Sequence, residues 1–130
     1  MVAGADLSSS QFLAVKADTA DGDAVLAGAG EMAVGILQNK PGNTEEATVA
    51  VAGIVKAKAG ASVTQGTPVS VNASGKIVTA TLASVDTSDG GAAADPVNGS
   101  YVLGIAMQSA DADDVFSILL THAGFWKATA

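Results

Sequence analysis

The residues that could carry out chemistry are few, and the most versatile is His122, the only histidine in a chain without cysteine. A zinc site requires several histidine, cysteine or carboxylate ligands, so a histidine-based metal centre is excluded within one chain. No serine stands in a Gly-x-Ser-x-Gly sequence, and a catalytic triad would have to recruit this same histidine. We therefore interpret His122 as a surface or packing residue, and we expect no catalytic residue and no enzymatic activity.

Two acidic stretches partly match a calcium-binding loop. One contains Asp111, Asp113 and Asp114, and the other covers residues 18–23. Neither has the glycine at the sixth position and the closing glutamate of an EF-hand loop. The Asp-Gly-Gly stretch at residues 89–91 lacks the Lys-Ser/Thr pair and the following helix of a phosphate loop. We interpret these carboxylates as solvated turn residues, and we predict neither a bound metal nor a cofactor.

The lysines Lys56 and Lys58 raise the question of a covalently attached cofactor. With the segment that follows them, up to Val69, they resemble the lipoyl and biotinyl carrier domains, in which a lysine at a hairpin tip carries the cofactor. Neither lysine has the flanking methionine or acidic residues of that pattern. The segment also predicts a strand rather than a tight turn, so we do not favour the carrier interpretation, which the absence of a lysine adduct in a mass measurement would remove.

The charge of the chain argues against two classes of partner. Its formal net charge is −7 over 130 residues, and all six basic side chains are lysines. Arginine is preferred for bidentate contacts to phosphate and guanine, and nucleic-acid affinity depends largely on neutralised phosphates. An excess of acid also opposes adhesion to anionic membranes. No apolar run approaches the roughly 20 residues that cross a bilayer, and no secretory signal is visible. We expect neither a nucleic-acid nor a membrane partner.

One sequence pattern occurs twice. Residues 34–38 are followed by a polar stretch and then by the apolar, β-rich run 47–52, which ends at Gly53. Residues 103–108 are followed by an acidic stretch and then by the run 115–120, which ends near Gly124. Each copy predicts a strand, a polar turn and a second strand, and two such hairpins can pair their apolar faces around one core.

The rest of the chain predicts further short strands. The clearest hairpin joins residues 68–71 to 76–80 through the turn sequence at 72–75. A bend is expected at Gly53 within the long run 48–58, because an isolated glycine in a strand often marks a bulge. Additional strands are predicted at 12–17, 24–27, 32–38, 101–108 and 115–121. The fold class is therefore all-β, a small β-barrel or β-sandwich with at most one short helical turn, within residues 61–65.

These patterns divide the chain into three predicted regions. Residues 1–11 are small, polar and acidic and predict an extended N-terminal arm that is not part of the core. Residues 12–124 form a single β domain, in which 84–100 is expected to be a mobile surface loop, and residues 125–130 form a C-terminal tail.

The arm and the tail supply the expected protein contacts. The arm could add to a strand edge of a partner by main-chain hydrogen bonds, and its removal is expected to leave a folded protein. Aromatic anchors are enriched at interface hot spots, although Trp126 could equally plug one end of the barrel. The interface candidates are Val2, Leu7, Phe12, Phe125 and Trp126.

The order and spacing of the elements are similar to those of the capsid decoration (cement) proteins of tailed bacteriophages. The stretches that carry the resemblance are residues 22–25, 34–36, 46–55, 66–69, 75–76, 102–106 and 115–120. The resemblance implies a compact β-barrel or sandwich, commonly a homotrimer, on the outer surface of the head. Its implied function is to clamp neighbouring copies of the major capsid protein in a virion assembled in the host cytoplasm, without catalytic or metal-binding residues.

Two other interpretations remain open from the residues alone. One is a different virion β-protein, such as a tail-tube or fibre-associated module. The other is a β domain that binds a small ligand or a carbohydrate, for which Tyr101 and Trp126 would be the stacking platform.

Overall fold

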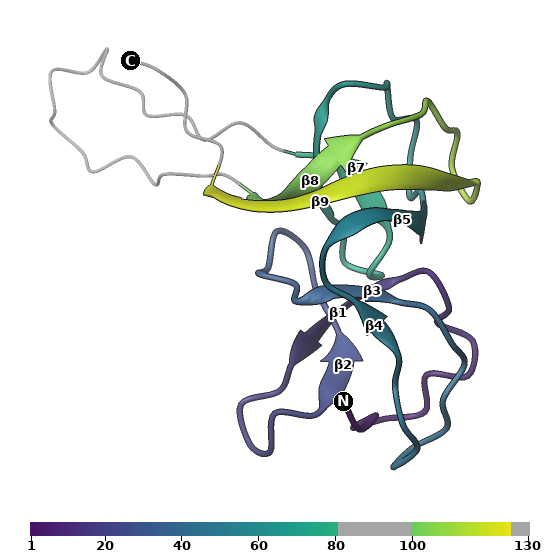
Figure 1. Cartoon of the computed structure of the whole chain (residues 1–130), viewed down its shortest axis with the longest axis vertical. Coiled ribbons are helices and arrows are strands. Elements are labelled where there is room, and N and C mark those ends of the chain that lie inside the picture. The colour runs from purple at the N-terminus through teal and green to yellow at the C-terminus, as the bar shows by residue number, and fades with distance from the viewer. Residues whose placement is uncertain (81–99, 126–130) are drawn as a thin grey trace, which may run out of the picture.

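The computed structural model describes residues 1–80 and 100–125, and within these ranges the regular structure consists of β-strands. The strands form two antiparallel sheets, the lower and upper layers in Figure 1. The expected all-β fold is confirmed, and it is sandwich-like because the sheets do not close into a barrel. No helix in the described ranges is suited to crossing a bilayer. The predicted loop 84–100 lies outside these ranges except for Ser100, and so does Trp126.

The first sheet has four strands in the order β2-β1-β3-β4. These are β1 (Ala14–Ala17), β2 (Ala24–Leu26), β3 (Gly35–Leu37) and β4 (Val49–Ala50). All are antiparallel to their neighbours, and β2 and β4 form the two edges of the sheet.

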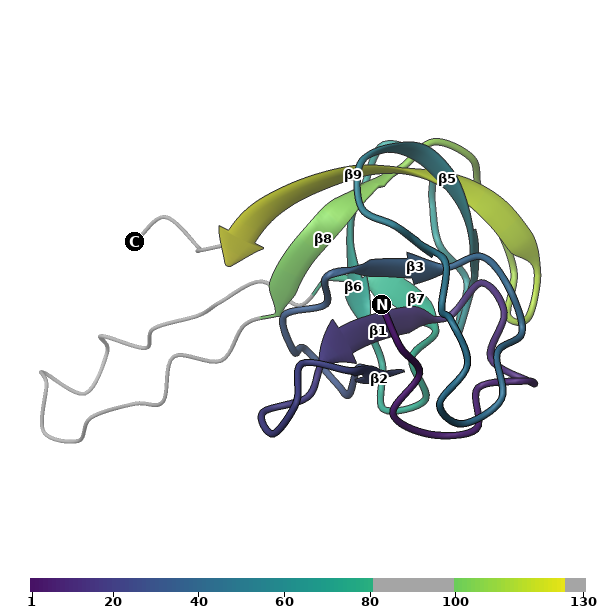
Figure 2. The ribbon, with the colours of Figure 1, turned by 60° about the horizontal axis from the view of Figure 1, so that its bottom comes forward.

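The second sheet has five strands in the order β5-β9-β8-β6-β7. They are β5 (Gly53–Lys58), β6 (Pro68–Val71), β7 (Ile77–Thr79), β8 (Tyr101–Ala106) and β9 (Val115–Phe125). Figure 2 shows the long β9 curving across this layer. The helical turn allowed for within residues 61–65 is absent, and Val63 instead bridges Ala110 in an extended segment.

The pattern that occurs twice in the sequence folds into two hairpins with the same register. Ile36 pairs with Ala50 in the β3–β4 hairpin, and Ile105 pairs with Leu119 in the β8–β9 hairpin. Each isoleucine follows a glycine on which a Cβ atom would overlap the opposite carbonyl oxygen. The glycines therefore allow the two strands of each hairpin to approach closely.

The hydrogen bonds of the two hairpins also match. Asn39 Oδ1 accepts a bond from the Thr48 N–H at 3.0 Å, and Gln108 Oε1 accepts one from the Ser117 N–H at 3.1 Å. The polar connections repeat as well, because Asp113 has the same left-handed φ of 69° as its counterpart Thr44.

The correspondence extends to the strands that precede each hairpin. In the first sheet Val15 of β1 pairs with Leu26 and Gly35, and in the second Val69 of β6 pairs with Thr79 and Gly104. The strand order β2-β1-β3-β4 is thus reproduced by β7-β6-β8-β9. The chain contains two copies of one four-stranded unit, which we call the first copy (β1–β4) and the second copy (β6–β9), and β5 is an additional strand.

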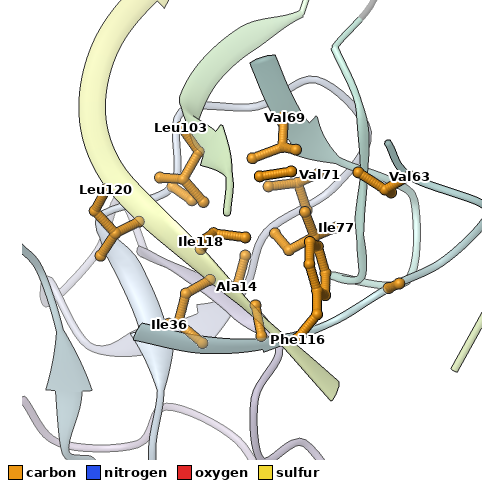
Figure 3. Close-up of a cluster of buried hydrophobic side chains, with 14 of the residues drawn as sticks. Ala14, Ile36, Val63, Val69, Val71, Ile77, Leu103, Phe116, Ile118 and Leu120 are labelled. Carbon is orange, nitrogen blue, oxygen red and sulfur yellow. The ribbon is translucent and has the colours of Figure 1, made fainter. Parts of the chain in front are cut away.

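The first copy has a small core of its own, and a larger cluster (Figure 3) contains the core of the second copy and joins the two sheets. Six residues form the core of the first copy: Ala3, Leu7, Val15, Ala24, Leu37 and Ala47. The equivalent positions of the second copy are all buried in the larger cluster: Ala59, Val63, Val69, Ile77, Ala106 and Phe116. Ala14 and Ile36 on the opposite face of the first sheet join the sheets by packing into the same larger cluster.

Ala3 and Leu7 correct the expectation that residues 1–11 are not part of the core. Ala3 is fully buried and Leu7 is 2% exposed. The Ala3 N–H donates to Glu45 O at 2.8 Å, as the Ala59 N–H does to Asp114 O in the second copy. The segment is extended, but its beginning occupies the place that the end of β5 holds in the second copy.

Candidate protein-binding surface

The His122 side chain makes contacts that connect two parts of the chain. It adopts a left-handed φ of 46° at a bulge of β9, and the equivalent position of the first copy is Gly53, with a φ of 82°. Its Nε2 lies 2.9 Å from the Val51 carbonyl oxygen, and because a carbonyl only accepts, Nε2 carries the donated hydrogen. The ring centroid lies 6.5 Å from that of Tyr101. The imidazole therefore ties β9 to the chain between β4 and β5.

The acidic stretches form turns. Lys76 Nζ donates to Asp113 Oδ1 at 2.6 Å, and this bond holds the pKa of the Asp113 carboxyl below its usual value. Asp18 Oδ1 accepts bonds at 2.9 Å from the N–H groups of Asp21 and Gly22, and the bond from Asp21 is the main reason that the pKa of Asp18 is lowered. Over the described residues, no group of three or more histidine, cysteine or acidic side chains is placed to hold a metal ion.

The predicted contact residues are not gathered at one site. Val2 is 40% exposed, whereas Leu7 is buried in the core of the first copy and its side chain is not available to a partner. Phe12 is half-buried and has a left-handed φ of 68°. It lines an open hollow of about 260 Å³ together with Lys40 and Lys58.

The C-terminal contact residues lie at or beyond the end of β9. Phe125 is the last residue of the strand, and its backbone pairs with that of Tyr101. The Tyr101 side chain is only 8% exposed, so it does not offer the stacking surface that a carbohydrate-binding site would need. Trp126 lies outside the described residues.

The structure reveals an exposed apolar row that the sequence analysis missed. Across the second sheet Ile54 pairs with Leu119, Leu119 with Ile105 and Ile105 with Pro68. Residues directly opposite in a sheet share one face, so these four side chains form one row, which we call the apolar row. Ile54 is 63% exposed, and the other three are partly exposed.

A sequence signal for the apolar row did exist. Ile54 alternates with Lys56 and Lys58, and residues two apart in a strand lie on one face. An isoleucine on the same face as two lysines is turned toward solvent, which would have identified it as an exposed apolar residue.

Two positions of the equivalent row in the first copy are covered, and the third, Ala50, is partly exposed. Ala14 and Ile36, which correspond to Pro68 and Ile105, are fully buried against the second sheet. The same position in the four-stranded unit therefore carries a packed interface in one copy and an exposed surface in the other. A contiguous apolar row at the surface is a candidate for a protein–protein contact.

Comparison with known proteins gives a family and a fold. Residues 6–122 match the family model described as phage cement protein. Among solved structures, the N base of the head fiber gp8.5 in bacteriophage phi29 is similar, with a TM-score of 0.66 and 12% sequence identity over 95% of this chain and 94% of that chain. At this identity the structural match shows a shared fold. No curated protein sequence matches this chain. The match over most of its length shows that the chain belongs to the phage cement protein family, a family of structural proteins of the phage head.

Proposed function

We propose that this protein decorates the outer surface of a phage head and stabilises the mature shell by clamping neighbouring major capsid proteins. The observation that carries the proposal is the match to phage cement proteins over residues 6–122. A protein that binds the assembled shell more tightly than the dissociated subunits shifts the equilibrium toward the shell, and the shift grows with its concentration relative to Kd. No chemical step is needed for this function.

We further propose that the protein acts as a homotrimer. Three linked copies can contact three sites at once, and such linkage increases the overall avidity by roughly 10²–10⁴ over one contact. Because each chain has a net charge of −7, the contacts between copies must be apolar or neutral near their centre. Val2, Phe12, Phe125 and Trp126 remain predicted contacts.

The apolar row is the face that we assign to the shell. It lies on a regular sheet, and its counterpart in the first copy already packs against another sheet. An apolar surface on a stiff body loses little conformational freedom on binding, which favours affinity.

Purified protein added to undecorated, expanded heads tests the function. We expect saturable binding and a higher temperature of head disassembly. Light scattering separates the other interpretations, since a stable trimer fits a cement protein, a hexamer a tube component and a monomer a ligand-binding module. Heads that stay undecorated at all protein concentrations would contradict the proposal.

Two substitutions at equally exposed residues test this assignment of the contact face. Ile54 and Met32 are both 63% exposed, but Met32 lies between β2 and β3 and not in the apolar row. A charge placed in an apolar contact is costly, and Ile54 is the most exposed member of the row, so Ile54→Asp is expected to weaken head binding at least about tenfold. Met32→Asp is expected to bind as the unchanged protein does. Equal binding by the two variants would assign the shell contact to another face.

A further inference from the structure

The outer edge of β4 has no neighbouring strand among the described residues, whereas the equivalent edge of β9 is paired with β5. β4 is an edge strand, paired only with β3 among the described residues. The Gln38 N–H donates to Thr48 O at 2.8 Å. Hydrogen-bonded pairs alternate along an antiparallel ladder, so the Val49 N–H and C=O point away from β3.

In the second copy the same edge is occupied. Ile118 of β9 is the equivalent of Val49, and it pairs with Val55 of β5. The pairing continues to Leu120 and Gly53, which makes β5 a fifth strand alongside the four-stranded unit. The first copy has no such strand in the described residues, and its edge over residues 48–51 is exposed or partly exposed.

Residues 1 and 2 lie along the same edge. The Ala47 N–H donates to Met1 O at 2.6 Å, and Val2 bridges Glu46. These pairs correspond to those of Ala57 and Lys58 on β9. Residues 1–2 thus occupy the last two positions of the fifth strand, and no strand of the described residues fills the positions along β4 that Gly53–Lys56 fill in the second copy.

One group at this edge is already engaged. The Val51 carbonyl oxygen accepts the bond from His122 Nε2, in the place where Leu120 pairs with Gly53 in the second copy. The Val49 N–H and C=O have no such side chain facing them in the described structure. The central donor and acceptor of the edge are therefore those of Val49.

We infer that this edge of β4, residues 48–51, binds an extended segment of the capsid protein as an added antiparallel strand. Strand addition to an exposed edge provides main-chain hydrogen bonds irrespective of most side chains. β5 shows the chemistry that fits, a short run of small, β-branched and lysine residues without proline, each of which has a main-chain N–H to donate. The choice of partner depends on the proposed function.

A second copy of this chain is a less suitable donor of the strand. Its β5 is paired with β9, and its residues 1–3 are paired with residues 24 and 44–47. Pairing of β4 with β4 would produce a two-fold dimer rather than a three-fold assembly. Occupation of the edge by a second copy would make the protection of the Val49 amide depend on protein concentration in the absence of heads, and this result would overturn the inference.

The test fills the edge from within the chain. A chain extended by Gly-Ile-Val-Lys ahead of Met1 reproduces residues 53–56 in the register that β5 adopts. The control carries Gly-Ile-Pro-Lys, in which proline removes the N–H that would bond to the Val49 carbonyl. Hydrogen exchange of the Val49 amide reports whether the edge is filled, and binding to undecorated, expanded heads reports the effect on function.

We expect the Gly-Ile-Val-Lys extension to slow exchange of the Val49 amide at least about tenfold and to weaken head binding at least about tenfold, because a tethered strand competes at millimolar effective concentration. The proline control is expected to match the unextended chain in both measurements. A protected Val49 amide with full head binding would overturn the inference, and so would an amide that neither extension protects. If the unextended chain does not bind heads, the proposed function fails, and so does the assignment of the added strand to the capsid protein. Hydrogen exchange of the Val49 amide in the extended chain still shows whether the edge accepts a strand.

Discussion

At the scale of single residues, equivalent turns in the two copies are closed by different side chains. Asp18 Oδ1 accepts bonds from the N–H groups of Asp21 and Gly22 in the first copy. Asn72 Oδ1 accepts bonds from the N–H groups of Ser74 and Lys76 in the second. An oxygen at this position closes the turn in both cases, but only the aspartate can be protonated.

This difference predicts a dependence on pH. The bond from the Asp21 N–H lowers the pKa of Asp18 from its ordinary value of 3.8. A carboxyl whose pKa is lowered by folding contributes stability above its ordinary pKa and loses it as the pH falls through the lowered value. Asparagine does not titrate, so Asp18→Asn is expected to make the loss of stability below pH 3.8 smaller than in the unchanged protein.

Urea unfolding at neutral and acidic pH measures this effect, and Asn72→Asp is the reciprocal variant. Asn72→Asp is expected to add a loss of stability at acidic pH that the unchanged chain does not show. If the two substitutions leave the pH dependence of unfolding unchanged, the turn carboxylate has no part in acid stability.

At the scale of elements, the hairpins depend on glycines that leave room for the opposite strand. A Cβ on Gly104 would overlap the Leu119 carbonyl oxygen, whereas a Cβ on Gly42 would meet only the flexible Glu45 side chain, 3.4 Å away. Gly104→Ala is therefore expected to destabilise the protein by about 1–3 kcal/mol, the usual cost of overpacking. Gly42→Ala serves as the control.

Thermal and urea unfolding of the two variants provide the comparison. The free energy of unfolding is expected to fall for Gly104→Ala and to change little for Gly42→Ala. Equal stabilities would mean that the strands of the β8–β9 hairpin can separate to admit a methyl group without cost.

The elements that could be predicted are those with a local signal. Both hairpins of the repeated pattern and the turn at residues 72–75 follow from alternation and turn residues, and the bend at Gly53 follows from its glycine. The bulge at His122 could not be predicted, because a histidine at that position gives no sign of a left-handed φ. The full duplication was also missed, because its evidence lies in registers and hydrogen bonds between distant strands.

At the scale of the whole molecule, the beginning of the chain completes the first core. Sequence analysis could not predict this, because residues 1–11 lack apolar periodicity and contribute only Ala3 and Leu7 to the core. Their burial depends on strands that lie elsewhere in the sequence, such as the one containing Ala24, which Ala3 bridges. The expectation that removal of residues 2–11 leaves a folded protein therefore changes, and we now expect the first copy to lose its packing.

A single substitution tests this without a deletion. Leu7→Ala is expected to cost about 2–5 kcal/mol of unfolding free energy, because it leaves a cavity in a small core. Val2→Ala, at a side chain that is 40% exposed, is expected to cost much less. Urea denaturation measures both, and a Leu7→Ala protein as stable as Val2→Ala would mean that the first segment is not part of the core in solution.

The repeated four-stranded unit has a consequence for the comparison with other folds. The likeness to the phi29 head fiber base spans 95% of this chain and 94% of that chain, at only 12% identity. A match of that extent requires both halves to be present in each molecule. The tandem arrangement is therefore a feature of the shared fold, and it persists where few residues are identical.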